Sequence, residues 1–144
     1  NVTVLDADGA HIIRTLDPGG SPFGMAVDPV SGNLYVLHGP PRGNCPATGM
    51  AIFDHTGLKL GDVLVGDSCD GGWIAVNPAN GRVYVAAMAL DQVWIMEADG
   101  SVRRILTTAD GIGHWPLGLA VDPLTARVFI GNHGDDTLTV ISDP

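Results

Sequence analysis

The chain has 144 residues, within the size of one domain, and combines 20 glycines and 10 prolines with 45% apolar residues, which is typical of a turn-rich folded chain and excludes extended disorder. Seven Lys and Arg against 16 Asp and Glu give a net charge of −9, which argues against nucleic acid and anionic membranes as partners, because phosphate groups recruit basic surfaces. No apolar run approaches the roughly 18 residues that a membrane-spanning helix needs.

The first expected elements are two strands within VTVLDADGAHIIRTL, at 2–16. Two short β-branched runs flank the segment DADG, which is typical of a tight strand-linking turn. Helical periodicity is not sustained here or elsewhere in the chain, and the apolar runs are short and bounded by Gly, Pro, Asp or Asn. The sequence therefore predicts an all-β protein.

A hairpin pattern then recurs three times along the chain. When Asp28, Asn77 and Asp122 are aligned, the copies are 49 and 45 residues apart, a period typical of propeller blades. In each copy a strand runs into DPVSGN, NPANGR or DPLTAR, and a second strand follows. Gly32 and Gly81 can adopt positive φ in this turn, and because Ala126 replaces them in the third copy, we expect that turn to be strained or differently shaped.

Third strands (MAIF, VWIM, LTVI) and fourth strands (KLGDVL, VRRIL) complete the repeat. The opening segment matches a third and a fourth strand, and the closing TLTVIS ends on a third. The prediction is an all-β β-propeller of about three four-stranded antiparallel blades, a partial or assembled ring, in one domain spanning 1–144. Its divisions are a partial blade at 1–19, blades at 20–68 and 69–112, and a partial blade at 113–144. The alternative is an open sandwich with accidental repeats.

The segment RVFIGNHGDDTLTVIS resembles the YVTN-type propeller repeat, and PFGMAVDPVSGNLYV and PLGLAVDP resemble both that repeat and the NHL repeat. The resemblance implies a propeller shape, which adhesion modules, cell-surface scaffolds, subunits of complexes and some enzymes share. A ring needs about 4–8 blades, so this chain should leave apolar side faces exposed. We expect further blades of the same polypeptide, or a second copy, to cover them.

Strand order places second-to-third loops and blade connections on one face, where most unusual polar residues fall. The loop between the strands at Val36 and Met50 is six residues longer than its counterparts, and loops on rigid scaffolds carry function. Trp115, next to His114, could stack a ligand or anchor a partner. The binding-face candidates are His38, Arg42, Asp70, Asp91, His114, Trp115, His133 and Asp135.

Residues on this face could form three kinds of metal or covalent site. His38, His114 and His133 could converge on zinc with an open position, and Asp110, Asp135 and Asp136 could hold calcium. The simpler interpretation is that these are loop residues satisfied by neighbouring backbone, so no cofactor is expected, with Ca²⁺ or Zn²⁺ as the alternatives. Cys45 and Cys69 lie in polar turn-rich segments and would form a disulfide in an oxidising compartment.

No G-x-S-x-G motif, phosphate-binding glycine loop or nucleophile with a nearby base is found in the sequence. The leading functional hypothesis is therefore a non-enzymatic scaffold or protein-interaction module that is extracellular, periplasmic or at the cell surface. The alternative is a metal-dependent propeller lyase or hydrolase that uses the loop histidines. A lectin-like carbohydrate binder ranks last, because the counterparts of Trp115 are Ser21 and Asp70.

Overall fold

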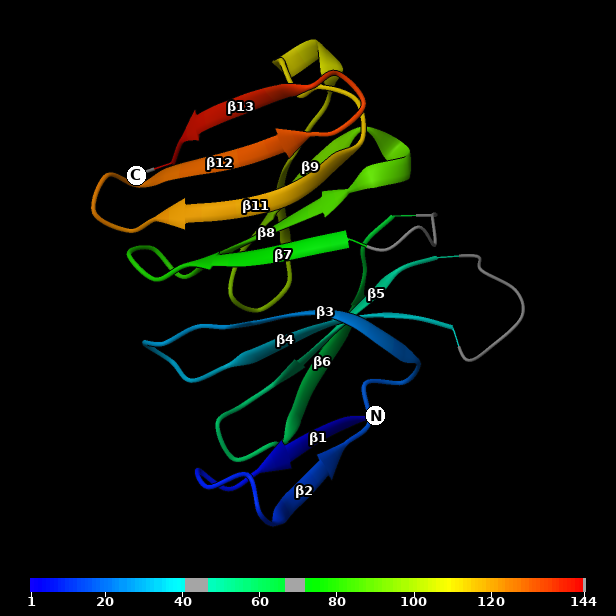
Figure 1. Cartoon of the computed structure of the whole chain (residues 1–144), viewed down its shortest axis with the longest axis vertical. Helices are drawn as coiled ribbons and strands as arrows, with labels where there is room; N and C mark the ends of the chain where they lie inside the picture. Colours follow the sequence, from blue (N-terminus) through cyan, green and yellow to red (C-terminus); the bar gives the residue numbers. More distant parts are fainter. Residues whose placement is uncertain (41–46, 67–71, 144) are drawn as a thin grey trace.

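The computed structural model describes residues 1–40, 47–66 and 72–143. These residues form antiparallel sheets of two, four, four and three strands, arranged one after another along the chain (Figure 1). The predicted all-β propeller architecture is confirmed. The strands are β1 (Val2–Leu5), β2 (Ile12–Leu16), β3 (Ser21–Val27), β4 (Leu34–Gly39), β5 (Gly49–Phe53), β6 (Lys59–Leu64), β7 (Gly72–Asn77), β8 (Arg82–Ala87), β9 (Gln92–Met96), β10 (Val102–Leu106), β11 (Pro116–Asp122), β12 (Arg127–Asn132) and β13 (Thr137–Ser142).

Within each complete sheet the strands pair in chain order, so every blade is a meander. The orders are β3-β4-β5-β6 and β7-β8-β9-β10, while β11-β12-β13 lacks a fourth strand and β1-β2 stands alone in its sheet. The alignment of the repeats is reflected in the register, because Tyr35 on β4 pairs with Ile52 and its counterpart Tyr84 on β8 pairs with Ile95.

The turns between the first and second strands of each blade are stabilised by the Asp or Asn residue at their first position. In the first copy Asp28 Oδ1 accepts a hydrogen bond from the N–H of Val30 at 3.0 Å, and Gly32 donates its N–H to the Asp28 carbonyl at 2.8 Å. Gly32 has φ 76° and Gly81 has φ 71°. Ala126 adopts φ 52° at the matching position, so the third turn is strained, as expected, because a side chain in the left-handed region is disfavoured.

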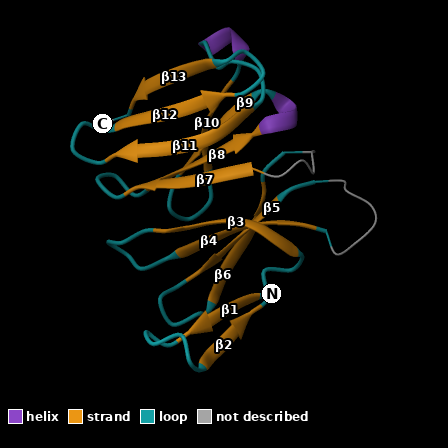
Figure 2. Ribbon diagram, in the orientation of Figure 1, coloured by secondary structure: helices purple, strands orange, loops and turns teal. Residues whose placement is uncertain are grey.

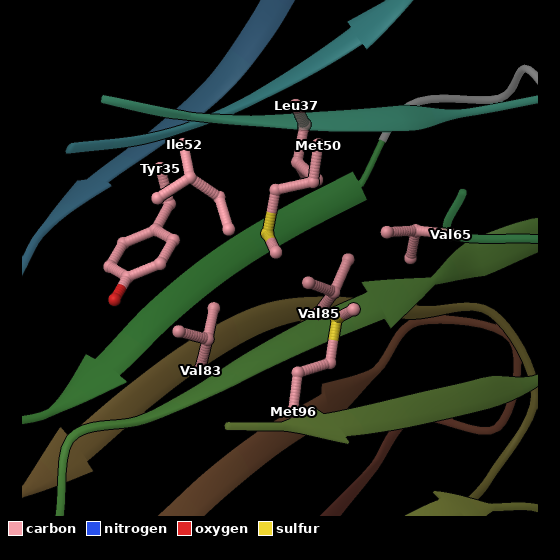
Figure 3. Packing of buried hydrophobic residues seen from close by; sticks show 8 residues of the cluster. All are labelled: Tyr35, Leu37, Met50, Ile52, Val65, Val83, Val85 and Met96. Carbon is pink, nitrogen blue, oxygen red and sulfur yellow. The ribbon is translucent and has the colours of Figure 1, made fainter. Parts of the chain in front are cut away.

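The core lies between successive sheets and not within any one of them. A cluster of buried side chains fills the space between the sheet β3–β6 and the sheet β7–β10 (Figure 3). Its members are Tyr35, Leu37, Met50, Ile52, Val65, Val83, Val85 and Met96. A second cluster joins the sheet β7–β10 to the sheet β11–β13, and a third joins β1–β2 to the sheet β3–β6. The sequence repeats because each blade buries its face on its neighbour.

Two single-turn 3₁₀ helices mark one end of the blades, η1 (Met88–Leu90) between β8 and β9 and η2 (Thr108–Asp110) between β10 and β11. Figure 2 shows both at the end opposite the β7–β8 and β11–β12 turns. We call this end, with η1, η2, the segment before β11 and the β12–β13 loop, the loop face. None of the helices in the described residues is long and apolar enough to cross a membrane.

The inner strand of the first complete blade has one uncovered side. Ile74 and Val76 on β7 pack against the preceding blade. The matching residues Met25 and Val27 on β3 are 56% and 57% exposed, because β1 and β2 correspond to third and fourth strands and no inner strand precedes β3 in this chain. The exposed apolar side faces expected of a partial ring are therefore present.

Candidate functional site

Asp91 and His114 hold two neighbouring parts of the loop face together. Asp91 follows η1 in the left-handed conformation, with φ 51°, and ends that helix by donating its N–H to the carbonyl of Met88. His114 lies between η2 and β11. The His114 Nδ1 and the Asp91 Oδ2 are 2.7 Å apart, so an ion pair links the second-to-third loop of one blade to the start of the next.

Backbone hydrogen bonds fix the residues around this pair. The N–H of Trp115 donates to Asp91 Oδ1 at 2.8 Å, and the N–H of His114 donates to Asp135 Oδ2 at 2.6 Å. On the other side, the N–H groups of His133 and Gly134 donate to the carbonyls of Trp115 and His114 at 3.0 and 2.9 Å. The segment before β11 is therefore tied to both the loop after β8 and the β12–β13 loop.

The indole of Trp115 is a large exposed side chain on this surface. Trp115 is 55% exposed, although its backbone has φ 53° and its N–H and C=O are both bonded. Its ring lies 6.2 Å from the ring of His133, centroid to centroid, at a tilt of 34°. A large aromatic group held on a fixed backbone and bordered by imidazole and carboxylate groups can pack against a partner or stack on a flat ligand.

The ion pair shifts the pKa values of both partners in the direction that keeps it charged. The hydrogen bond to Asp91, followed by the charges of Asp91 and Asp135, raises the pKa of His114 above its usual value. The Trp115 N–H and the His114 side chain lower the pKa of Asp91. Imidazolium and carboxylate are thus the favoured forms, although both groups are solvent-accessible, so the interaction is partly screened.

His38 lies in a different environment from His114 and His133. Its Nε2 is 3.0 Å from Asp62 Oδ1 on β6, and Lys59 Nζ is 2.7 Å from Asp62 Oδ2. Burial raises the pKa of Asp62, but the hydrogen bonds from Lys59 and His38 outweigh it, so the pKa lies below its usual value. His38 and Asp62 border a groove of about 340 Å³. The imidazole fits because Gly49 beneath it carries no side chain, and a Cβ there would be 2.6 Å from His38 Nε2.

The described residues contain no group of three or more His, Cys, Asp or Glu side chains that could hold a metal ion. His38, His114 and His133 are accordingly not brought together. Asp110 belongs to the alternative calcium site, but its carboxylate makes local contacts, because it accepts hydrogen bonds from the Thr107 N–H and from Arg104.

Five of the eight binding-face candidates converge on the loop face, and these are Asp91, His114, Trp115, His133 and Asp135. Arg42, Asp70 and both cysteines lie outside the described residues, and so does the proposed Cys45–Cys69 disulfide.

The sequence analysis did not identify Asp62, which is the hydrogen-bond partner of His38. A charged residue inside the apolar strand pattern KLGDVL was the available signal.

No protein-family model matches the chain, but solved structures resemble it. Hydrazine synthase of Kuenenia stuttgartiensis matches with a TM-score of 0.66 and 21% identity, over 93% of this chain and 35% of that one. A nidogen/laminin complex matches with a TM-score of 0.64 and 15% identity, over 94% and 48%. A gluconolactonase from Xanthomonas campestris matches with a TM-score of 0.61 and 21% identity, over 95% and 42%.

These matched structures are β-propellers, so the chain has a β-propeller fold. It spans less than half the length of each of these proteins, which agrees with its incomplete first and last blades. At this level of identity the likeness establishes the fold alone, and the function must be argued from the loop face.

Proposed function

We propose that this chain is part of a β-propeller that acts as a non-enzymatic interaction module and binds a protein partner on the loop face around Trp115. The observation that carries the proposal is the combination of an indole that is 55% exposed with a backbone bonded on both sides, to Asp91 and to His133. An aromatic anchor whose backbone is already fixed loses little backbone entropy on binding. Exposed side chains of this size are enriched at the energetic centres of protein interfaces.

The surroundings of Trp115 support a protein partner in particular. His114, His133 and Asp135 are exposed polar residues around the indole, the arrangement of an apolar anchor inside a hydrated rim that is usual at interfaces. A carbohydrate site would call for an aromatic residue in each blade, and the counterparts of Trp115 are Ser21 and Asp70.

The solved neighbours do not decide between binding and catalysis, because they comprise two enzymes and one protein complex. The alternative is a metal-dependent lyase or hydrolase that uses the loop histidines. Convergence of His38 with His114 and His133 would favour it, and the described residues contain no such group. We further propose an extracellular, periplasmic or cell-surface location. Two free thiols at Cys45 and Cys69, titrated in denatured and unreduced native protein, would contradict it.

The test begins with affinity capture, in which the complete native protein is used as bait in an extract of its source. The captured protein is identified and purified, and binding isotherms between the two proteins are then measured. Trp115→Ala should weaken binding at least about tenfold, as loss of an interface anchor does. Leu124→Ala is the matched control, because Leu124 is 94% exposed but lies beyond the opposite end of β11, and it should bind like the wild type. Equal affinity of all three proteins would overturn the proposal.

A further inference from the structure

The loop face carries more carboxylates than cationic side chains. Its segments 88–91, 108–115 and 133–136 contain four aspartates and no lysine or arginine. Arg104 of β10 pairs with Asp110 at 2.8 Å, and His114 pairs with Asp91 at 2.7 Å. The other two aspartates, at 135 and 136, form no ion pair with any residue in the described ranges. Two carboxylates on this face therefore lack a counter-charge.

These two carboxylates lie in the β12–β13 loop, which also carries His133. Asp135 Oδ2 accepts the N–H of His114 at 2.6 Å, so this carboxylate is fixed beside the segment that leads to Trp115. Asp136 is exposed and makes no hydrogen bond with the described residues. From His133 to Asp136 the backbone spans at most about 11 Å, and the His133 ring lies 6.2 Å from the indole. The carboxylates are thus within one small patch with Trp115.

The backbone of this patch adopts conformations that side chains disfavour. Three of the four non-glycine residues with positive φ in the described residues lie on the loop face, and these are Asp91, Trp115 and Asp136. The left-handed region is uncommon for a residue as bulky as tryptophan, and such conformations gather at functional sites. Here the strained residue presents an exposed indole, so the packing of the chain does not account for it.

An exposed indole beside carboxylates suits a guanidinium group. The face of the indole attracts a cation, and the planar guanidinium stacks on it more readily than an ammonium does, because it is more weakly hydrated. Its N–H groups then donate to carboxylates in charge-assisted hydrogen bonds. An apolar partner would desolvate the two carboxylates without compensation, and an anionic partner would be repelled by them and by the net charge of −9.

We propose that the protein partner of the loop face presents an arginine whose guanidinium stacks on the indole of Trp115, with the carboxylates of Asp135 and Asp136 as its counter-charges. This inference rests on the proposed function, and it names the chemistry by which the partner is recognised. It also assigns Asp135 and Asp136 a binding role that is separate from the positioning of Trp115 by Asp91.

The test uses three blocked tripeptides, Gly-Arg-Gly, Gly-Lys-Gly and Gly-Gln-Gly, as probes. Each is titrated into the complete protein labelled with fluorotryptophan, and the fluorine resonance of Trp115, assigned with Trp115→Phe, is followed. The arginine peptide should bind at least about fivefold more tightly than the glutamine peptide. The lysine peptide should bind less tightly than the arginine peptide, and added salt should weaken the binding of both cationic peptides.

A charge-removing variant tests the carboxylates. Asp135→Asn combined with Asp136→Asn should weaken binding of the arginine peptide about threefold or more and leave the glutamine peptide unaffected. Asparagine still accepts the N–H of His114 and tolerates positive φ. The matched control, Asp8→Gln combined with Asp99→Gln, removes the same charge from exposed turns at the opposite end of the blades and should bind like the wild type.

Equal affinity for the arginine and glutamine peptides, or no shift of the Trp115 resonance, would overturn the proposal, and these titrations need only the wild-type protein. A lysine peptide that binds as tightly as the arginine peptide would overturn the assignment to arginine. The captured partner separates this inference from the proposed function. If Trp115→Ala weakens its binding and the Asp135 and Asp136 variant does not, the arginine contact is wrong and the interaction module stands. If neither change weakens it, the proposed function fails.

Discussion

The side chains of Asp91 and His114 lie 2.7 Å apart although 23 residues separate them in the chain. Asp91 also accepts a hydrogen bond from the N–H of Trp115, so one carboxylate fixes both the imidazole and the backbone that presents the indole. The exposed tryptophan is thus positioned by a contact between neighbouring blades, which a single isolated blade would not make.

The first prediction concerns the ionisation of this pair. A folded-state pKa above the unfolded value means that His114 contributes stability that is present at low pH and lost as pH rises through the raised pKa. Asp91 has a lowered pKa, so its contribution is lost as pH falls through that value. NMR titration should show the His114 pKa falling on Asp91→Asn. Asp99→Asn, in the β9–β10 turn, is the control, and an equal fall there would refute the assignment.

The second prediction uses the strained turn of the third hairpin. Ala126 holds φ 52° where the other copies have glycine, so Ala126→Gly should stabilise the protein by about 0.5–1 kcal/mol. The reciprocal change Gly81→Ala should destabilise it by a similar amount, because no atom lies near the added Cβ and the effect is confined to the backbone. Denaturant unfolding measures both, and destabilisation by Ala126→Gly would show that the backbone is not strained.

The repeat alignment predicted the strand order, since Asp28, Asn77 and Asp122 open turns whose chemistry is local. It also identified Ala126 as the exception. The positions of Trp115 and His133 on one face followed from strand order alone.

The arrangement of Trp115 relative to His133 could not be predicted from the sequence, because it depends on hydrogen bonds between loops of different blades. The conformation of Asp91, with φ 51°, leaves no mark in the sequence. His38 illustrates the same limit. Its loop position suggested a partner on the loop face, but the absence of a side chain at Gly49 lets the ring turn towards Asp62 on β6.

The third prediction concerns the uncovered side of β3. Met25 and Val27 are more than half exposed, and apolar surface of this kind promotes association. The chain 1–144 should therefore self-associate, and Met25→Gln with Val27→Thr should weaken the association about tenfold, which corresponds to about 1.4 kcal/mol. Sedimentation equilibrium measures it, with Leu124→Gln as the exposed control. A monomeric parent chain, or an equal effect of the control, would contradict the prediction.

The most direct test of the binding surface is hydroxyl-radical footprinting of the complete protein with and without its captured partner. Trp115 and His133 should both become protected when the partner is bound, since they lie on the loop face with their rings 6.2 Å apart. Leu124, beyond the opposite end of β11, should react at the same rate in both samples. Protection of Leu124 with Trp115 still fully reactive would place the partner on the other face and contradict the account.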